Sequence, residues 1–322
     1  MAETTSTFGA AMRGVGVTFT EFFNQAVFTE MSGWDPVVKT LRSNNLTDTF
    51  SGKTGAGLLQ RFSDGSTIPS ANRYKLFDTS AEHNPYGGRL EVTRQTRLYR
   101  DFDAVFDESS DLITSVNGTL SRAGAQVFNR AFTAGNGVTN GVYVTQYADG
   151  SRLASTSHAR ADGGTAQSNA SSTSIPLTES NLEVGRIALS LQLQDDGTPM
   201  MDTGQLYLVV GINNEKTARI ITESNLRSGT GNNDVNIYTG GAVAVMSSKW
   251  LDTNAGGTNN THWFLVAPKW AKLAISISKG PDLDVLQDKD TKSFLWDVVL
   301  DFFVISYDWR GTYCSQGNNA AY

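Results

Sequence analysis

Residues 153–164 read Leu-Ala-Ser-Thr-Ser-His-Ala-Arg-Ala-Asp-Gly-Gly, and Ser168-Asn169 follows a few residues later. The stretch lies within residues 136–176, a region rich in Gly, Ser, Thr and Asn, which indicates a loop with a short hairpin centred on Asp149-Gly150. Ser155, Ser157, His158 and Asp162 supply the residue types of a hydrolytic triad. Triad members, however, come from separate elements that meet in a pocket, and the chain has no Gly-x-Ser-x-Gly elbow. We therefore predict that His158 anchors the loop through hydrogen bonds and has no catalytic role.

A long helix is predicted just before this loop, over residues 110–134. Its apolar residues recur at helical spacing and form one stripe: Leu112, Val116, Leu120, Ala123, Val127 and Ala131. Ser109 or Ser110 can cap its first turn. A helix of this length spans about 37 Å. Gly118 and Gly124 lie inside it, where glycine costs up to about 1 kcal/mol relative to alanine, so we expect close backbone packing at both positions.

Alternating helices and strands are predicted after the loop. Thr178 can cap a helix that runs to about Gln194, and Asn213 or Asn214 can cap a second helix. Strands are expected at residues 206–210, 242–246, 263–267, 273–278 and 294–309. The last of these would run about 50 Å, far longer than an ordinary strand, and therefore requires a large sheet.

Residues 55–103 are predicted to form extended ribbons separated by turns. Two clusters of turn-forming residues, at 63–66 and 84–88, interrupt them. A ribbon with so few apolar residues buries little surface by itself, so we expect it to pack on another subunit. Before it, the first 50 residues or so contain an amphipathic segment, which either packs on its own domain or reaches a neighbour as an arm.

The ribbon carries a basic run that is followed directly by acidic residues. The charged residues are Arg89, Arg94, Arg97, Arg100, Asp101 and Asp103. Adjacent runs of opposite charge suit complementary pairing between neighbouring subunits. The alternative is a solvated surface with ion pairs worth about 0–1 kcal/mol each. We take these six residues as candidate contacts between subunits.

Composition limits the classes of function. The chain has 322 residues, 26 basic and 32 acidic, for a net charge of −6. A protein that grips nucleic acid neutralises phosphates with clustered basic side chains, so direct DNA binding is not expected, whereas a container for DNA is permitted. The single cysteine, Cys314, excludes an intramolecular disulfide and is predicted to be an inert free thiol in a reducing compartment.

The sequence shows no sign of export or of membrane insertion. No stretch approaches the roughly 20 consecutive apolar residues of a membrane span, and the N-terminal residues do not resemble a secretory signal. We therefore expect the protein to stay in the cytoplasm in which it is made.

Other patterns that suggest chemistry fail on inspection. Gly52-Lys53-Thr54 resembles the end of a phosphate-binding loop, but Thr47 stands where that motif requires glycine. The three histidines are isolated, so none forms a pair with metal-ligand spacing. The acidic residues Asp282, Asp284, Asp288 and Asp290 lack the glycine and terminal glutamate of a calcium loop, which favours a solvated loop. No metal and no cofactor is expected.

The stretch at 153–164 resembles the loop typical of the Mu-like major head subunit family of bacteriophages. That family shows a Ser-Thr-x-His step, then Ala-Asp-Gly-Gly and Ser-Asn, and here Ala159 stands where proline is frequent. The order of the predicted elements is also similar, and residues 307–311, Tyr-Asp-Trp-Arg-Gly, look like the C-terminal strand of the family. The similarity spans roughly residues 10–315.

The resemblance implies the α+β fold of tailed-phage capsid proteins. Its expected parts are an N-terminal arm (1–52), an extended β-hairpin loop (53–103), a peripheral domain (104–176) with a spine helix (110–134), an axial domain (177–270) and strands that return to the peripheral domain (271–322). Within this scheme, four residues would belong to a structural loop: His158, Asp162, Gly163 and Gly164.

The function that the resemblance implies is structural and not enzymatic. The chain would form hexamers and pentamers of an icosahedral virion shell around double-stranded DNA, together with scaffolding, portal and possibly decoration proteins. Two alternatives remain open. One is the shell protein of an encapsulin-like nanocompartment, which encloses enzymes; the other is a carbohydrate-binding or tail-adhesin module, against which the long helix argues.

Overall fold

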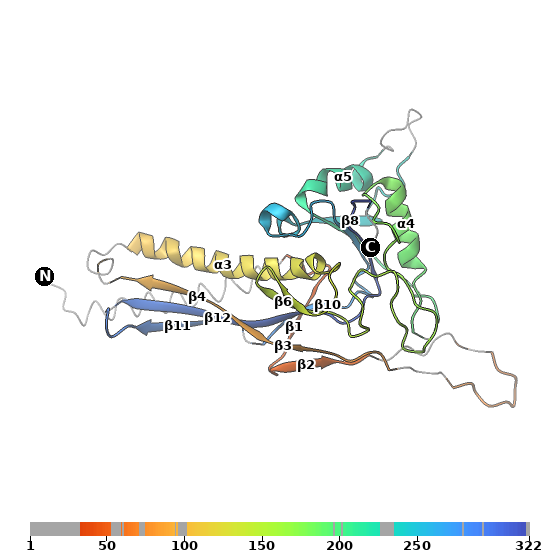
Figure 1. Cartoon of the computed structure of the whole chain (residues 1–322), viewed down its shortest axis with the longest axis horizontal. Coiled ribbons are helices and arrows are strands. Elements are labelled where there is room, and N and C mark those ends of the chain that lie inside the picture. The colour runs from red at the N-terminus through yellow and green to blue at the C-terminus, as the bar shows by residue number, and fades with distance from the viewer. Residues whose placement is uncertain are drawn as a thin grey trace.

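The computed structural model shows an α+β protein built from layers of sheet and helix (Figure 1). The structure describes residues 33–52, 59, 61–70, 75–93, 95, 102–195, 197–200, 202–225, 235–278, 280–291 and 293–319. Among the helices of these residues, none combines the length and the apolar character that a bilayer span requires.

The larger sheet is organised around one long strand, β12. In the described part of the chain its strands are β1 (Lys39–Arg42), β4 (Asn84–Val92), β5 (Gly137–Thr139), β6 (Val142–Thr145), β10 (Leu273–Ile277), β11 (Asp282–Gln287) and β12 (Phe294–Ser306). β12 runs antiparallel to β4, β10 and β11 and parallel to β6. The predicted long strand is confirmed, with 13 residues. Alternate residues face opposite sides, so Trp296 and Val298 are buried while Val299 is exposed.

The smaller sheet has the order β13-β9-β7-β8. Its strands are β7 (Leu206–Val210), β8 (Val243–Ser247), β9 (Trp263–Val266) and β13 (Thr312–Ser315), and the neighbouring helical elements are α4 (Glu179–Ser190), α5 (Ile212–Glu223), η1 (Lys249–Leu251) and η2 (Thr253–Ala255). Thr178 caps α4 as predicted, because its Oγ1 accepts a hydrogen bond from the Asn181 N–H. The predicted cap of α5 is wrong: Gly211 occupies the cap position, and the carboxylate of Asp252 accepts from the Ile212 N–H at 2.7 Å.

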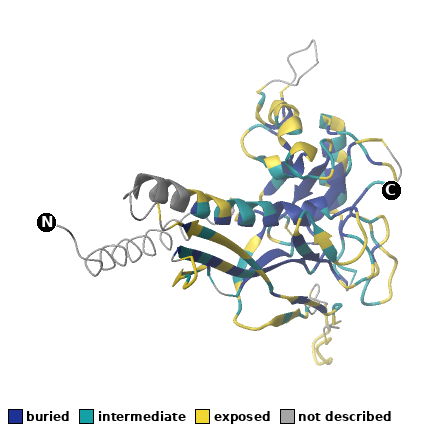
Figure 2. Cartoon of the chain, turned by 60° about the vertical axis from the view of Figure 1, so that its left-hand side comes forward, coloured by how far each residue is buried: buried dark blue, intermediate teal, exposed yellow. Residues whose placement is uncertain are grey.

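Helix α3 (Phe102–Asn129) lies along one face of the larger sheet, and its C-terminal end reaches the smaller sheet, where Phe128 contacts Phe264 (Figures 1 and 2). One core joins Leu120 of this helix to Phe302 of the larger sheet and to Phe264 of the smaller sheet. A second core lies between the smaller sheet and the layer formed by α4 and α5. A third lies on the far face of the larger sheet, under the small ribbon of β2 (Thr47–Phe50) and β3 (Thr79–Glu82). Burial of apolar faces between successive layers therefore holds the fold together.

Both ends of the long helix lie earlier in the chain than predicted. The helix begins at Phe102 rather than near residue 110, so Ser109 and Ser110 lie inside it and cap nothing. Its first turns are rich in acidic residues, which are favourable near the positive end of a helix dipole. At the other end the chain leaves the helix after Asn129, where the Gln146 side chain donates hydrogen bonds to the backbone carbonyls of the following turn.

An Asn-Gly turn joins β5 to β6. Asn140 and Gly141 have φ angles of 49° and 77°, the pair of positive values that a type I′ hairpin turn requires. A hairpin centred on Asp149-Gly150 was expected from the sequence, and that expectation is wrong. Asp149 instead accepts a hydrogen bond from the Ser151 N–H and closes a local turn.

Residues expected in an N-terminal arm or a free ribbon are partly built into the sheets of the same chain. Trp34 is buried, and β1 pairs in parallel with β10, so the chain joins the body well before residue 52. β4 pairs with β12 along its whole length and turns Tyr86 and Leu90 toward the main core. β4 is therefore held by its own chain and does not need another subunit to bury its apolar side chains. The amphipathic segment near the N-terminus lies outside the described residues.

Two predictions for the C-terminal third also need correction. Residues 271–322 do not return as a whole to the larger sheet, because β13 pairs with β9 in the smaller one. The acidic stretch expected to be a solvated loop begins with an edge strand, β11, which pairs with β12. Aspartates that alternate with apolar residues fit an exposed edge strand, where charge discourages pairing with other chains.

Candidate functional site

The loop at residues 149–169 folds around the buried side chain of His158. The ring Nδ1 lies 2.6 Å from Oδ2 of Asp149. The ring Nε2 lies 3.2 Å from Oδ1 of Asn169 and 3.3 Å from the backbone oxygen of Leu153. The histidine is only 1% exposed. Both ring nitrogens therefore hold the loop together, and neither faces solvent or a serine hydroxyl.

Asn169 ties this loop to the C-terminal part of the chain. Its Nδ2 donates to the Leu153 oxygen at 2.6 Å and to Oγ1 of Thr312 at 3.0 Å. Its backbone oxygen accepts from the Cys314 N–H at 2.9 Å. The histidine ring also stacks on Trp309, with ring centroids 4.3 Å apart and an interplanar angle of 4°. The loop is thus fastened to the segment that follows β12.

Asp162, Gly163 and Gly164 form a tight turn at the outer end of the loop. Gly163 has a φ of 75°, and the Gly164 N–H donates to Oδ1 of Asp162 at 2.8 Å. The guanidinium of Arg160 makes a two-point ion pair with the same carboxylate. Burial alone would raise the pKa of the Asp162 carboxyl, but the Gly164 and Arg160 hydrogen bonds outweigh it and lower the pKa. The geometry is that of a self-contained turn without an open ligand position.

The candidate subunit contacts are only partly described. Arg89, on β4, makes a two-point ion pair with Asp297 on β12, at 2.6 and 2.7 Å. The two residues are directly opposite in the register of the strands. Arg94, Arg97, Arg100 and Asp101 lie outside the described residues, and Asp103 is placed only as part of the α3 backbone.

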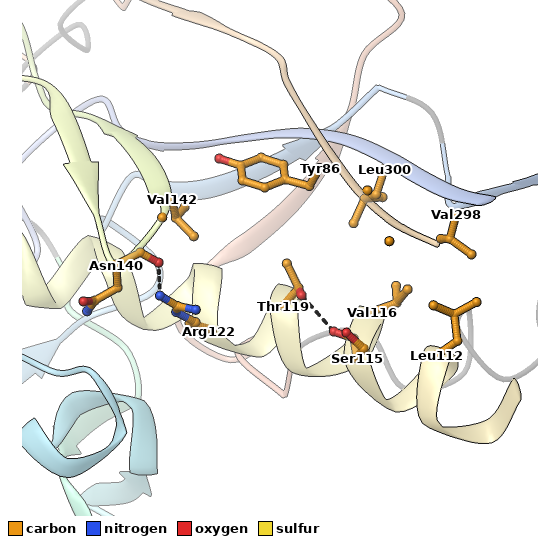
Figure 3. Close-up of a pocket in the computed structure, with 13 residues that line it drawn as sticks. Tyr86, Leu112, Ser115, Val116, Thr119, Arg122, Asn140, Val142, Val298 and Leu300 are labelled. Atoms are coloured by element: carbon orange, nitrogen blue, oxygen red, sulfur yellow. Dashed lines mark hydrogen bonds between the residues drawn. The ribbon is translucent and has the colours of Figure 1, made fainter. Parts of the chain in front are cut away.

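A cavity of about 280 Å³ opens between α3, β4 and β12 (Figure 3). Its lining is mainly apolar: Tyr86, Leu112, Val116, Val142, Val298 and Leu300. Gly87 and Gly88 leave room on the β4 side. Arg122 stands at one end and donates to the backbone oxygen of Asn140. The lining holds no pair of titratable groups suited to acid–base chemistry.

The structure places the single cysteine in the core and describes only part of the other groups that the sequence patterns singled out. Cys314 is buried in the core, and burial raises the pKa of its thiol to about 12, although a hydrogen bond involving Thr312 opposes the shift. Within the described ranges, no three His, Cys, Asp or Glu side chains are grouped so that they could hold a metal ion. Lys53 and Thr54, from the phosphate-loop lookalike, lie outside those ranges.

Sequence reasoning assigned no role to one cluster that the fold assembles. Arg310 forms buried ion pairs with Asp308 and with Asp195, a residue more than a hundred positions earlier in the chain. The only available signal was the presence of charged residues beside the most apolar strand, because their partner is brought near by the fold alone.

Comparison with known proteins identifies the family. A family model described as phage capsid protein matches residues 77–315. No curated protein matches the chain. Among solved structures, one of Mycobacterium phage Patience is 10% identical, with 97% of this chain and 89% of that chain covered and a TM-score of 0.51.

Two further solved structures are less similar. The capsid of an empty GTA particle is 9% identical, with 88% and 89% covered and a TM-score of 0.49. The capsid of Helicobacter pylori bacteriophage KHP30 is 10% identical, with 86% of each chain covered and a TM-score of 0.49. Since the family match covers well over half of the chain and includes the whole smaller sheet and most of the larger one, this chain belongs to the phage capsid protein family and is a shell protein of the virion.

Proposed function

We propose that this chain is the major head subunit of a tailed phage and assembles into the hexamers and pentamers of an icosahedral shell around double-stranded DNA. The observation that carries the proposal is the match to phage capsid proteins over residues 77–315, a range that contains α3, most strands of the larger sheet and the whole smaller sheet. The net charge of −6 supports a container, because a wall without clustered basic residues does not bind the enclosed phosphates tightly.

Exposed apolar side chains on the loop between β2 and β3 support assembly with other copies. Leu59 is fully exposed, Ile68 is 72% exposed and Phe62 is 50% exposed. The base of the loop is closed by a hydrogen bond from the Leu76 N–H to the Gly52 oxygen at 2.9 Å. Apolar side chains left in water favour burial against another molecule, so this loop suits a contact between subunits.

The proposed domain scheme follows the resemblance to the Mu-like subfamily, as adjusted to the structure. The long helix and the larger sheet would form the peripheral domain, and the smaller sheet with α4 and α5 would form the axial domain. The segment before Trp34 would be the arm, and the β2–β3 loop would be the extended loop. His158, Asp162, Gly163 and Gly164 would hold the structural loop between the two domains.

The proposed partners are further copies of the chain, with scaffolding, portal and possibly decoration proteins. Arg89, Arg94, Arg97, Arg100, Asp101 and Asp103 remain proposed contacts between subunits. For Arg89 the ion pair with Asp297 leaves the guanidinium largely exposed, with 59% of its side chain accessible. One pair of hydrogen bonds within the chain can therefore coexist with a contact to a neighbour.

Assembly of the purified chain tests the proposal. We expect expression, alone or with the scaffolding protein encoded beside it, to yield closed shells in electron micrographs and capsomers in sedimentation experiments. Strictly monomeric protein at every concentration, even with the scaffold present, would contradict the proposal. Genes for a terminase and a portal beside this one favour the phage head, whereas a cargo enzyme would favour a nanocompartment.

A further inference from the structure

The chain passes between the two sheets twice at one corner of the molecule, and the two connecting segments run side by side. Residues 267–272 lead from β9 to β10, and residues 307–311 lead from β12 to β13. Backbone hydrogen bonds join the connections, from the Tyr307 N–H to the Lys272 oxygen at 3.0 Å and from the Ala267 N–H to the Gly311 oxygen at 2.7 Å. The corner therefore ties one sheet to the other through backbone hydrogen bonds.

The backbone is closely packed at Gly311, in the middle of this corner. Gly311 has a φ of 75°, and a Cβ at this position would lie 2.5 Å from the Ala271 nitrogen. The Gln192 side chain, just after α4, accepts from the Gly311 N–H at 2.8 Å and donates to the Thr312 oxygen at 2.9 Å. The Trp309 ring contacts both the His158 ring, with centroids 4.3 Å apart, and the guanidinium of Arg310, whose Cζ lies 4.8 Å from the ring centroid.

Arg310 joins the two layers directly. Its Nη1 lies 3.0 Å from Oδ1 of Asp308, which follows β12 of the larger sheet. Its Nη2 lies 2.8 Å from Oδ1 of Asp195, which follows α4 in the layer of the smaller sheet. Its Nε donates to the Leu193 oxygen at 3.1 Å. The side chains of Arg310 and Asp195 are 5% and 2% exposed, so water screens this cluster little.

An ion cluster in this position fixes the relative placement of the two layers more than it adds to the free energy of unfolding. Removing charges from water is costly, so a buried pair is often no more stable than apolar residues of the same volume. Burial raises the pKa of the Asp308 carboxyl, and Arg310 opposes that shift. The planar guanidinium, however, fixes the positions of several acceptors at once. Apolar layers can slide over one another, whereas a guanidinium that donates hydrogen bonds to Asp308 and to the Leu193 oxygen, and ion-pairs with Asp195, favours one arrangement.

We propose that Arg310 is a positioning residue that sets the angle between the two sheets, and that this angle helps to determine the curvature of the shell. The second half of the inference rests on the proposed function as a shell subunit. In a closed assembly the shape of each subunit fixes the rotation to the next one, so a change of internal angle alters how the shell closes.

A charge-free corner tests the proposal. The triple variant Asp195→Asn, Asp308→Asn and Arg310→Met removes the whole ionic cluster and leaves no unpaired charge. The single variant Asp195→Asn removes one charge and keeps the shape. The control, Arg219→Met, deletes an exposed arginine on α5 that pairs with Glu215 and Glu223.

We expect the triple variant to keep the far-UV circular dichroism and a cooperative melt, since the apolar cores are unchanged. Hydrogen exchange at residues 307–312 should become at least tenfold faster, and electron micrographs should show a broad range of shell diameters or open sheets. The control should give the exchange rates and the single diameter of the wild type.

A folded triple variant with wild-type exchange or a wild-type diameter distribution would overturn the corresponding half of the inference. If the triple variant does not fold, the same two measurements on Asp195→Asn decide. If wild type and control also fail to form shells, the proposed function fails, while exchange at residues 307–312 still tests whether the cluster fixes the corner.

Discussion

His262 shows how burial alone sets the chemistry of a single residue. The ring lies just before β9, with centroids 4.6 Å from Phe132 and 6.0 Å from Phe264. It is only 4% exposed. Its Nδ1 has no hydrogen-bond partner in the described part of the chain. Burial therefore lowers the pKa of His262 from 6.5 to about 4, because the charged ring would lose its hydration.

This shift predicts acid sensitivity. The folded state keeps the ring neutral below pH 6.5, while the unfolded chain takes up a proton there, so the free energy of unfolding falls as pH drops from 6.5 towards 4. His262→Phe should reduce the loss between pH 7 and pH 4 by about 3 kcal/mol, since one pKa unit corresponds to about 1.4 kcal/mol. Denaturant titrations at both pH values measure it. An equal loss in wild type and variant would contradict the assignment.

Residue roles were only partly predictable from the sequence. His158 stands out because polar loop residues surround it, and a hydrogen-bonded anchor was expected. Its partners Asp149 and Asn169 were not foreseen as such, since nothing local distinguishes them from other loop residues. The link from Asp195 to Arg310 is less predictable still, because it exists only once two sheets have met. Local pattern thus indicates that a side chain is held, but not which residue holds it.

At the scale of elements, helix α3 separates two glycines that look alike in the sequence. A Cβ on Gly124 would overlap the indole of Trp34, whereas nothing lies within 4 Å of the position of a Cβ on Gly118. Trp34 also stacks on Phe128 at 5.5 Å and donates to the Ser121 oxygen at 2.7 Å. The close packing predicted for both glycines is therefore found at Gly124 alone.

This difference predicts opposite effects of the same substitution. Gly124→Ala should lower the free energy of unfolding by about 1–3 kcal/mol, because the indole must shift in a packed core. Gly118→Ala, the matched control on the same helix, should raise it by up to about 1 kcal/mol, because alanine favours the helix more than glycine does. Urea titrations of both variants provide the comparison. Destabilisation of the two by similar amounts would show that the Trp34 contact is not what matters.

Elements with a clear apolar pattern were predicted well. The strands at β7, β9, β10 and β12 coincide closely with apolar runs, and they are confirmed. The start of α3 was missed because its first turns are polar and carry no apolar period. β11 was missed because its aspartates suggested a loop, although Asp282 and Asp284 alternate with Leu283 as strand residues do.

At the scale of the whole molecule, the loop between β2 and β3 is separable from the fold, whereas the ribbon that follows it is not. Replacing residues 53–75 with a short Gly/Ser turn keeps Leu76 and Phe77, which contact Gly52 and the main core, and should preserve the cooperative melt and the circular dichroism. Shell closure should be lost, because the replacement removes the exposed apolar side chains of Leu59, Phe62 and Ile68. Sedimentation and electron microscopy measure the loss.

A longer replacement provides the control. Extending the replacement to residues 53–88 should unfold the subunit, because β3 and half of β4 are lost and Tyr86 no longer stacks on Phe302 at 4.1 Å. If the shorter replacement also unfolds the chain, the loop belongs to the core of the subunit. If it assembles normally, the loop has no part in contacts between subunits.

The long strand β12 has a mechanical consequence. It is bonded along both edges, with β4 and β6 on one side of its length and β10 and β11 on the other. Tension along β12 therefore loads many backbone hydrogen bonds in shear at the same time, and none can yield before its neighbours. The two-stranded ribbon of β2 and β3 has four residue pairs and can be peeled open one pair at a time. Under stress the subunit should thus act as a stiff beam along β12 with a compliant attachment at the β2–β3 ribbon.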